Sequence, residues 1–181
     1  MAGTGGNGGG AMVCARRLMG WGYKVKVGVS NPQKLKEIPA HQYHILQSMG
    51  AELIPADRFS SEIKPDLIID GIIGYSLSGN PVGHAASLME WANESDAPVL
   101  ALDTPSGVDL STGIIHAPVI NAEATMTLAL PKVGLFNDAV KSLRGDLYLG
   151  DISVPSSLYS EPSLGLEVDN IFRKGDLLRL D

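Results

Sequence analysis

The sequence predicts an α/β fold built on one open, mostly parallel β-sheet with helices on both faces. Two observations favour this class. Apolar strand-like runs alternate along the chain with segments of helical spacing, and short turns rich in glycine and proline separate them. The strand candidate over 67–70 is short, apolar and branched, which is typical of a parallel-sheet strand that is buried on both faces.

The predicted elements follow one another in a regular order. A helix over 11–20 ends at Gly20 and Gly22, as expected for a helix that stops at glycine. The elements after it are a strand over 23–29, a helix over 40–49, strands over 52–54 and 67–70, a helix over 83–94, and strands over 98–102, 124–130 and 146–152. An irregular tail follows Pro155. We therefore expect one domain over 1–158 and a C-terminal tail over 159–181.

The composition excludes several classes of protein. A net charge of −6 without a Lys/Arg cluster argues against a nucleic-acid-binding surface. Cys14 is the single cysteine, so an intrachain disulfide and a cysteine metal cluster are impossible, and its place on the apolar face of the first helix predicts a buried, inert thiol. No apolar run reaches the length of a membrane span, and the start is unlike a signal peptide. We expect a soluble, cytoplasmic protein.

The glycine-rich start is the first candidate for a binding site. Six of the eight residues over 3–10 are glycine, and the run leads directly into the first predicted helix. Such a loop brings backbone N–H groups close to a ligand at the positive end of a helix, which favours an anion. In nucleotide-binding α/β folds the loop follows a buried strand, for which this chain leaves no room. A flexible terminus is the alternative interpretation.

Polar residues also fall where the predicted strands end, the usual place for a ligand in such sheets. Asp70 is suited to bind a cation or a hydroxyl group, or simply to cap its turn. Asp103 is a candidate general acid or base. No histidine stands at a sequence distance from Ser106 that would indicate a catalytic partner, which argues against a serine hydrolase. Lys132 is either a phosphate contact or a solvated surface lysine.

Five motifs occur in one order along residues 3–158. They are Gly3–Gly9 with Ala15-Arg16, Asp70 with Gly74 and Leu77-Ser78, Asp103 with Pro105–Gly107, Pro131-Lys132 with Gly134-Leu135, and Gly150–Ile152 with Pro155. In these motifs the chain resembles the N-terminal domain of the YjeF family, the NAD(P)H-hydrate epimerases. The resemblance implies a Rossmann-like three-layer α/β/α sandwich. It also implies a homodimer that interconverts the R and S epimers of hydrated NADH and NADPH, in functional association with an NAD(P)H-hydrate dehydratase.

The resemblance also implies the site residues, position by position. Asn7, Asp70 and Ser106 match potassium ligands, with one K⁺ per subunit, and Asp103 matches a residue that contacts the substrate and is our candidate acid–base group. The residues implied to bind the hydrated dinucleotide are Gly6, Asn7, Gly8, Gly9, Gly10, Gly74, Tyr75, Ser76, Leu77, Ser78, Gly79, Asn80 and Asp103.

The chain also departs from the family pattern. Gly6, Gly10 and Ala11 stand where the family usually has Asn, Asp and Gly, and Tyr75-Ser76 replaces a Thr-Gly pair. The family's leading helices and first strand precede the glycine run and are absent here, so we expect an N-terminally truncated domain. Losing that strand would break the sheet, so either the chain is a fragment of a longer product or the strand is supplied from elsewhere, and otherwise the chain is poorly stable. These departures give an alternative, a catalytically impaired binding or scaffold domain. A redox Rossmann enzyme is disfavoured because no suitably placed acidic residue for the ribose follows the glycine run, and no catalytic His or Lys stands at a characteristic position.

Overall fold

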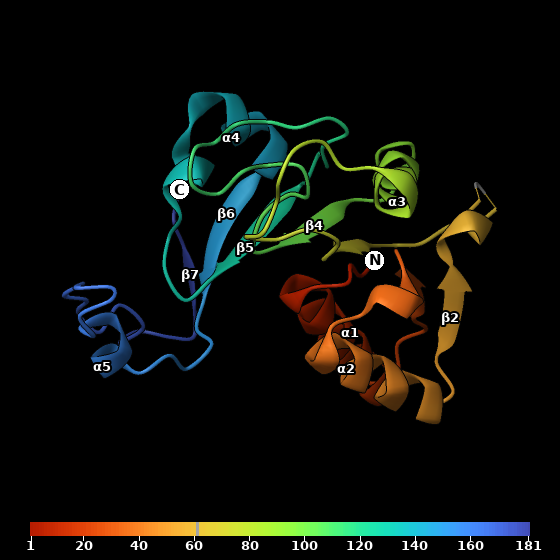
Figure 1. Cartoon of the computed structure of the whole chain (residues 1–181), viewed down its shortest axis with the longest axis horizontal. Helices are drawn as coiled ribbons and strands as arrows, with labels where there is room; N and C mark the ends of the chain where they lie inside the picture. The colour runs from red at the N-terminus through yellow and green to blue at the C-terminus, as the bar shows by residue number, and fades with distance from the viewer. Residues whose placement is uncertain (61) are drawn as a thin grey trace.

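The computed structural model describes residues 1–60 and 62–181 and has the predicted alternation of strands and helices (Figure 1). The helices are α1 (Gly6–Gly20), α2 (Glu37–Ser48), α3 (Gly83–Asn93), α4 (Asp138–Arg144) and α5 (Ser156–Tyr159), with short 3₁₀ helices at Pro32–Lys34, Ala56–Arg58 and Val133–Phe136. The strands are β1 (Lys26–Val29), β2 (Glu52–Pro55), β3 (Ile68–Asp70), β4 (Val99–Leu102), β5 (Ala124–Leu128), β6 (Asp146–Gly150) and β7 (Leu177–Arg179).

The strands form two hydrogen-bonded sheets that lie edge to edge. β1 pairs with β2, and the larger sheet has the order β3-β4-β5-β6-β7. All neighbours are parallel except β6 and β7, which are antiparallel. This confirms the prediction of a mostly parallel α/β sheet.

The N-terminal residues join the two sheets. The sequence left no room for a strand before the glycine run, but Ala2 forms parallel bridges to Val29 beside β1 and to Gly71 beside β3. Its N–H donates to the carbonyl of Gly28 at 2.8 Å, and the Gly71 N–H donates to the carbonyl of Met1 at 3.0 Å. No regular strand occurs among the described residues before α1, as expected, but residues 1–3 lie in the central position between β1 and β3 as a very short bridging segment. A Cβ on Gly3 would lie 1.8 Å from the carbonyl oxygen of Ile72, so only glycine fits there.

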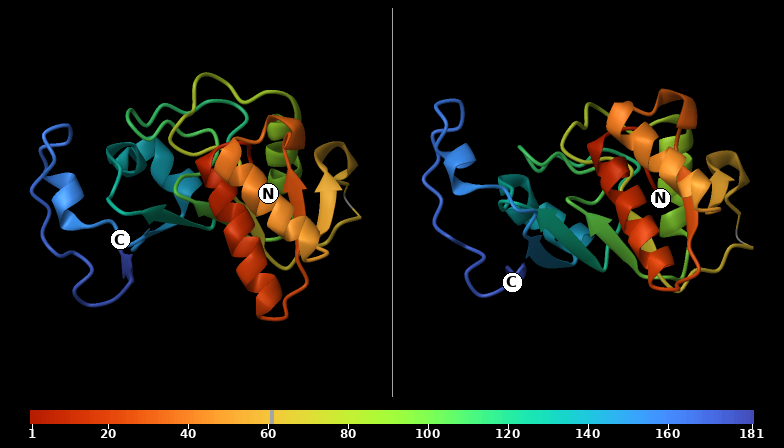
Figure 2. Two further views of the ribbon diagram at one scale, coloured as in Figure 1. Left: turned by 60° about the horizontal axis from the view of Figure 1, so that its bottom comes forward. Right: turned by 90° about the horizontal axis from the view of Figure 1, so that it is seen from below.

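Helices cover both faces of the strands. α1 and α2 lie on one face, and α3 and α4 lie on the other (Figures 1 and 2). Met12 of α1 and Leu46 of α2 are fully buried on the first face, and Leu88 and Met89 of α3 are fully buried on the second. These apolar side chains hold the layers together, because burying each of them stabilises the fold by about 2 kcal/mol.

Two elements begin or lie where the sequence did not predict them. α1 begins at Gly6 rather than at residue 11, so most of the glycine run is the first turn of a helix and not a loop. The predicted irregular tail contributes β7 to the sheet. Glycine disfavours helix, and the run Leu177–Arg179 is too short to indicate a strand by itself, so in both places tertiary packing decides the local structure.

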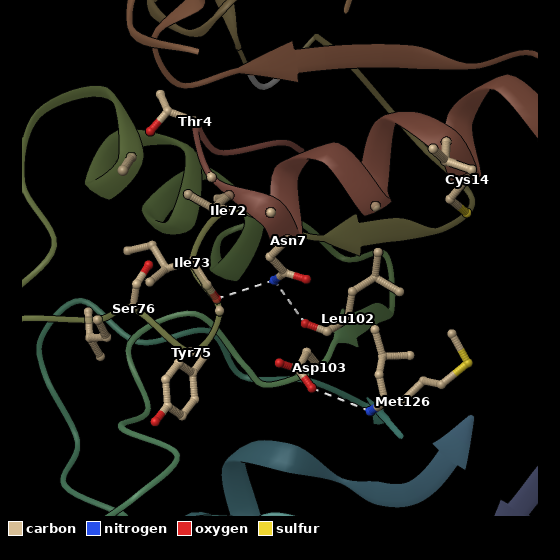
Figure 3. Close-up of a pocket in the computed structure, with 18 of the residues that line it drawn as sticks. Thr4, Asn7, Cys14, Ile72, Ile73, Tyr75, Ser76, Leu102, Asp103 and Met126 are labelled. Carbon is tan, nitrogen blue, oxygen red and sulfur yellow. Dashed lines mark hydrogen bonds between the residues drawn. The ribbon is translucent and has the colours of Figure 1, made fainter. Parts of the chain in front are cut away.

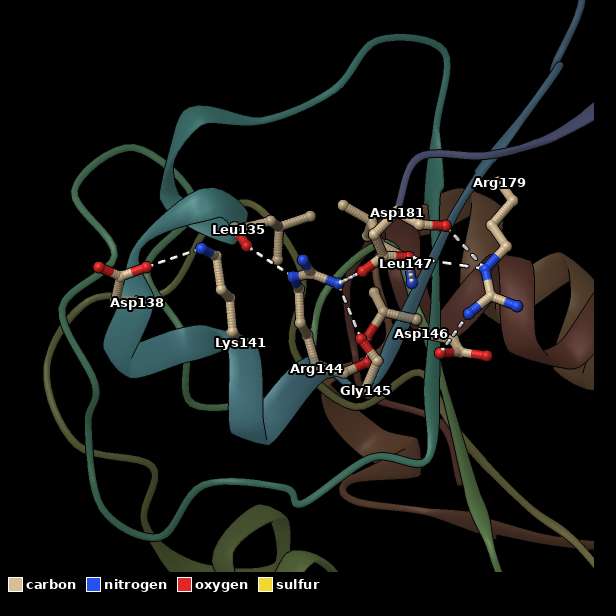
Figure 4. Close-up of polar contacts among 10 residues, drawn as sticks. Leu135, Asp138, Lys141, Arg144, Gly145, Asp146, Leu147, Arg179 and Asp181 are labelled. Atoms are coloured by element: carbon tan, nitrogen blue, oxygen red, sulfur yellow. Dashed lines mark hydrogen bonds and ion pairs between the residues drawn. The ribbon is translucent and has the colours of Figure 1, made fainter.

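A buried arginine secures β7 (Figure 4). Arg144 at the end of α4 is 3% exposed and donates to the carbonyls of Leu135 (2.8 Å) and Gly145 (2.7 Å). Its guanidinium also pairs with Asp181 at 2.6 Å, and Asp181 accepts the Leu147 N–H at 3.0 Å. The Arg144 guanidinium lowers the pKa of the Asp181 carboxyl. These contacts tie the last residues of the chain to α4 and β6.

Candidate active site

A cavity of about 1200 Å³ opens at the carboxyl ends of β3, β4 and β5 and extends along α1 (Figure 3). This is where ligands bind in open parallel sheets. Its lining residues are Thr4, Gly5, Gly6, Asn7, Gly10, Val13, Cys14, Arg17, Leu18, Trp21, Lys36, the whole segment 72–82, Ala85, Leu102, Asp103, Met126, Leu128, Lys132, Asp151 and Ile152. No histidine is among the described residues that line it.

The glycines at the start of α1 serve two different purposes. Gly6 and Gly10 line the cavity, and a Cβ on either would meet no atom within 4 Å. Gly8 and Gly9 are buried on the other side of the helix, where a Cβ on Gly8 would lie 2.0 Å from the carbonyl oxygen of Gly3 and one on Gly9 3.5 Å from Pro39. Of the predicted substrate contacts, Gly6, Asn7 and Gly10 therefore border the cavity, whereas Gly8 lets the helix pack against residues 1–3 and Gly9 lets it pack against α2.

Asn7 connects α1 to the ends of two strands. Its Nδ2 donates to the carbonyl of Leu102 at 3.0 Å and to that of Ile73 at 3.3 Å (Figure 3). The close approach of the two segments requires a glycine on the opposite side, because a Cβ on Gly74 would lie 3.0 Å from the Cβ of Asn7. Asn7 thus fixes the glycine-rich turn against the segment that follows β3.

Asp70 and Ser106 form a buried polar pair, both 0% exposed. Asp70 accepts the Ser106 hydroxyl at 2.7 Å, the Ser106 N–H at 2.8 Å and the Ile72 N–H at 3.1 Å. The Ser106 hydroxyl in turn accepts the Ile73 N–H at 2.8 Å. Burial raises the pKa of Asp70, and its hydrogen bonds partly oppose that effect. The sequence left open whether Asp70 caps its own turn. In the structure it does so through the Ile72 N–H, and it also holds the loop that carries Ser106.

The segment after β3 forms one wall of the cavity. All seven residues predicted as substrate contacts in it, from Gly74 to Asn80, are part of the lining. Tyr75 is 76% exposed, so its ring is available to a ligand rather than packed in the core. At the far end, Asn80 accepts the Ala117 N–H at 3.3 Å, which attaches the segment to the loop after β4.

Asp103 follows β4 directly and faces the cavity. Its backbone is left-handed, with φ 65°, which is uncommon for a residue other than glycine. Lys132 donates to Asp103 Oδ1 at 2.6 Å. The Asp103 side chain is only 15% exposed and the Lys132 side chain 22%. Of the two sequence interpretations of Lys132, the solvated surface lysine is therefore wrong. Lys132 lines the cavity beside the candidate acid–base residue.

Sequence reasoning missed the long wall that α1 contributes. Gly6, Gly10, Cys14, Leu18 and Trp21 recur at helical spacing, and all line the cavity. The spacing itself was visible, but the sequence did not show that the glycine run belongs to the same helix. The prediction that Cys14 is buried is corrected, because its side chain is half-buried and borders the cavity. Burial raises the pKa of this thiol, which keeps it in the unreactive protonated form.

The parallel sheet, the helices on both faces and the cavity at the strand ends define a Rossmann-like α/β protein. The family model described as YjeF-related protein N-terminus matches residues 1–134, and the chain belongs to this family. The resemblance drawn from the sequence motifs is thereby confirmed.

The chain is similar to several named proteins. A protein of Dehalogenimonas lykanthroporepellens named NAD(P)H-hydrate epimerase is 36% identical over 165 residues, which are 91% of this chain and 65% of that protein. One of the same name from Lentilactobacillus buchneri is 36% identical over 85% of this chain and 71% of its own length. The bifunctional NAD(P)H-hydrate repair enzyme Nnr of Moorella thermoacetica is 34% identical, and the chain spans only 31% of it. The crystal structure of the yeast protein YNL200c has the same fold, with a TM-score of 0.78, 24% identity, and coverage of 99% of this chain and 75% of that one.

Proposed function

We propose that the chain is an NAD(P)H-hydrate epimerase domain that interconverts the R and S epimers of hydrated NADH and NADPH. The observation that carries the proposal is the Asp103 carboxylate, which is held at one oxygen by Lys132 and lies in a large cavity at the ends of parallel strands. The names of relatives that are 36% identical over most of the chain support the same activity.

The reaction requires proton transfer and no redox step. The two epimers differ at C6 of the hydrated ring, where a hydroxyl group stands next to N1. Either the hydroxyl leaves as water and water adds to the other face, or the ring opens to a carbonyl and closes again. Both routes move a proton to or from the C6 oxygen, and one positioned carboxyl group can do so in both directions. Asp103 is the group that we assign to this role.

The glycine-rich start of α1 supports binding of the dinucleotide. Gly6 and Gly10 leave open space toward the cavity, and the first turn of a helix offers N–H groups without intrahelical partners. We propose that the pyrophosphate lies at this turn and that the wall from Gly74 to Asn80 covers the rest of the substrate. The exposed Tyr75 ring gives that wall an apolar surface.

The donor groups around Asp70 fit the predicted potassium ion. Asp70 is a fully buried carboxylate whose three hydrogen bonds all come from neutral groups, and a nearby cation would compensate its charge. A carboxylate, a hydroxyl and backbone carbonyls are the oxygen ligands of a hard cation. Among the described residues there is no group of three His, Cys, Asp or Glu side chains for a metal ion, so zinc-type coordination does not fit this part of the chain.

We propose that Asp70 and Ser106 hold K⁺, and that the ion when bound would compensate the charge of Asp70 and fix the segment after β3, where Ile73 donates to Ser106 and lines the cavity. Asn7 is the third proposed ligand. Its amide nitrogen faces two carbonyls, so the arrangement supports Asp70 and Ser106 more directly than Asn7.

We further propose a homodimer that acts in the cytoplasm. The fusion of functions implied by the name of the Moorella relative supports a link to a dehydratase. Within the described residues no helix has the length and apolar character needed to cross a membrane.

A coupled assay tests the proposed activity. The purified protein is mixed with both epimers of hydrated NADH, potassium, and a dehydratase that consumes only the S epimer. We expect complete consumption of the substrate at a rate that rises with the concentration of this protein. Persistence of the R epimer at the uncatalysed rate would refute the enzyme, and tight binding without turnover would instead support the scaffold alternative.

A further inference from the structure

β4 and β5 end in the same unusual turn. Asp103 follows β4 and Ala129 follows β5, and both have φ 65°. In each turn the residue after the one with positive φ donates its N–H to the carbonyl of the last strand residue: Thr104 to Leu102 and Leu130 to Leu128, both at 2.8 Å. A hydrogen bond over two residues around a centre with positive φ is a γ-turn of the rare, strained form. Strain of this kind persists where the surrounding structure enforces it, and it is concentrated at functional sites.

Lys132 connects the two turns. Its ammonium donates to Asp103 Oδ1 at 2.6 Å and to the carbonyl of Leu128 at 2.6 Å. That carbonyl is the same one that closes the turn around Ala129. Because β4 and β5 are paired neighbours, with Leu102 opposite Met126, the turns lie side by side and one lysine reaches both. The lysine therefore fixes the position of Asp103 relative to β5.

All side-chain hydrogen bonds that Asp103 makes with the described residues are on one oxygen. Oδ1 accepts the Lys132 ammonium, the Thr127 hydroxyl at 3.3 Å and the Leu128 N–H at 3.3 Å. All three donors come from β5 and the segment that leaves it. Oδ2 makes no hydrogen bond with any residue that the structure describes, and in Figure 3 it points toward the side of the cavity where Tyr75 lies. One oxygen is anchored and the other faces the substrate space.

We infer that Lys132 is a positioning residue of the epimerase site. It anchors Oδ1, so that Oδ2 is the oxygen that exchanges a proton with the C6 oxygen of the substrate. The inference rests on the proposed function and deepens it. Proton transfer depends steeply on geometry, and a displacement of about 1 Å can cost roughly 100-fold in rate. The alternative is a purely structural lysine that braces β4 against β5 and has no effect on the reaction.

The test compares kcat with KM in variants of the full chain. Lys132→Met removes the ammonium at similar length, Lys132→Arg keeps a cation, and Lys141→Met is the matched control. Lys141 forms a pair with Asp138 at 2.7 Å in which the side chains are 54% and 93% exposed. We expect Lys132→Met to lower kcat by about 10- to 100-fold and to change KM by less than about threefold, because the group acts on geometry rather than on binding. Lys132→Arg should recover part of kcat, and Lys141→Met should match the wild type.

The outcomes separate this inference from the proposed function. An active wild type together with an equally active Lys132→Met variant overturns the inference alone, whereas an inactive wild type overturns both. If the methionine variant does not fold, as judged by circular dichroism, Lys132→Ala is assayed with added methylammonium. A saturable recovery of kcat supports the positioning role, since a brace needed only for folding gives none. Absence of any recovery in folded Lys132→Ala overturns it.

Discussion

Two alanine substitutions in the first turns of α1 should have opposite effects on stability. Gly8→Ala places a Cβ 2.0 Å from the carbonyl oxygen of Gly3, whereas the Cβ of Gly10→Ala meets no atom within 4 Å. Gly3 is held in place, because its N–H donates to the Gly71 carbonyl at 3.1 Å and the backbone of Ile72 lies so close that a Cβ on Gly3 would be 1.8 Å from its carbonyl oxygen. The helix start must therefore shift in the first variant and not in the second.

The size of the difference follows from two known contributions. Replacing glycine by alanine inside a helix gains about 1 kcal/mol. Forcing extra atoms into a packed region costs about 1–3 kcal/mol, and a clash with fixed backbone belongs at the upper end. Gly10→Ala should therefore be about 1 kcal/mol more stable than the wild type, and Gly8→Ala about 2 kcal/mol less stable. In a domain of this size 1 kcal/mol changes Tm by about 2–4 °C, so the two variants should melt roughly 6–12 °C apart.

Thermal unfolding followed by circular dichroism measures both values under one condition. Both variants remove the same residue type from the same helix, so each is a control for the other. A Gly8→Ala variant that melts at or above the wild-type temperature would refute the assignment of Gly8 to packing. A Gly10→Ala variant that melts as low as Gly8→Ala would refute the separation of the two kinds of glycine.

Three further predictions concern charge and burial. Burial raises the pKa of Asp70, so without a bound cation the folded protein retains a proton that the unfolded chain releases. The contribution of Asp70 to the free energy of unfolding therefore falls as pH rises from about 4 through the raised pKa. Urea unfolding at a series of pH values should show this decrease in the wild type and not in Asp70→Asn. Burial also raises the pKa of Cys14, so alkylation by iodoacetamide should be slower than for a free thiol at neutral pH and accelerate only above pH 9.0, the ordinary value; fast labelling at neutral pH would contradict this. Arg144→Ala should cost about 3 kcal/mol in urea unfolding, because it leaves Asp181 and two carbonyls without their partner, and hydrogen exchange should show a loosened β7. Unchanged protection of β7 would refute the role of this contact.

The sequence predicted where β3 and β4 end. Asp70 and Ser106 were expected at the same edge because the carboxyl ends of neighbouring parallel strands meet there, and the structure joins them by hydrogen bonds. The buried strands were visible as apolar runs because both faces of a parallel strand are covered.

Other features could not be read from local sequence. Glycine has a low helix propensity, so nothing local placed the start of α1 at Gly6; the contact of Gly8 with Gly3 does so in three dimensions. The pairing of Lys132 with Asp103 joins residues 29 positions apart and depends on the turns that end β4 and β5. β7 depends on the contact between Arg144 and Asp181, which are 37 positions apart. Each of these features is fixed by tertiary contacts rather than by residue pattern.

The most direct test of the central assignment is the rate of epimerisation by Asp103→Asn compared with the wild type, measured in the coupled assay with potassium present. Asparagine keeps the size of the side chain and removes its ability to exchange a proton. A general acid–base residue contributes about 100- to 10,000-fold, so kcat should fall by at least about 100-fold while the variant remains folded and binds the substrate. Wild-type kcat in folded Asp103→Asn would contradict the account.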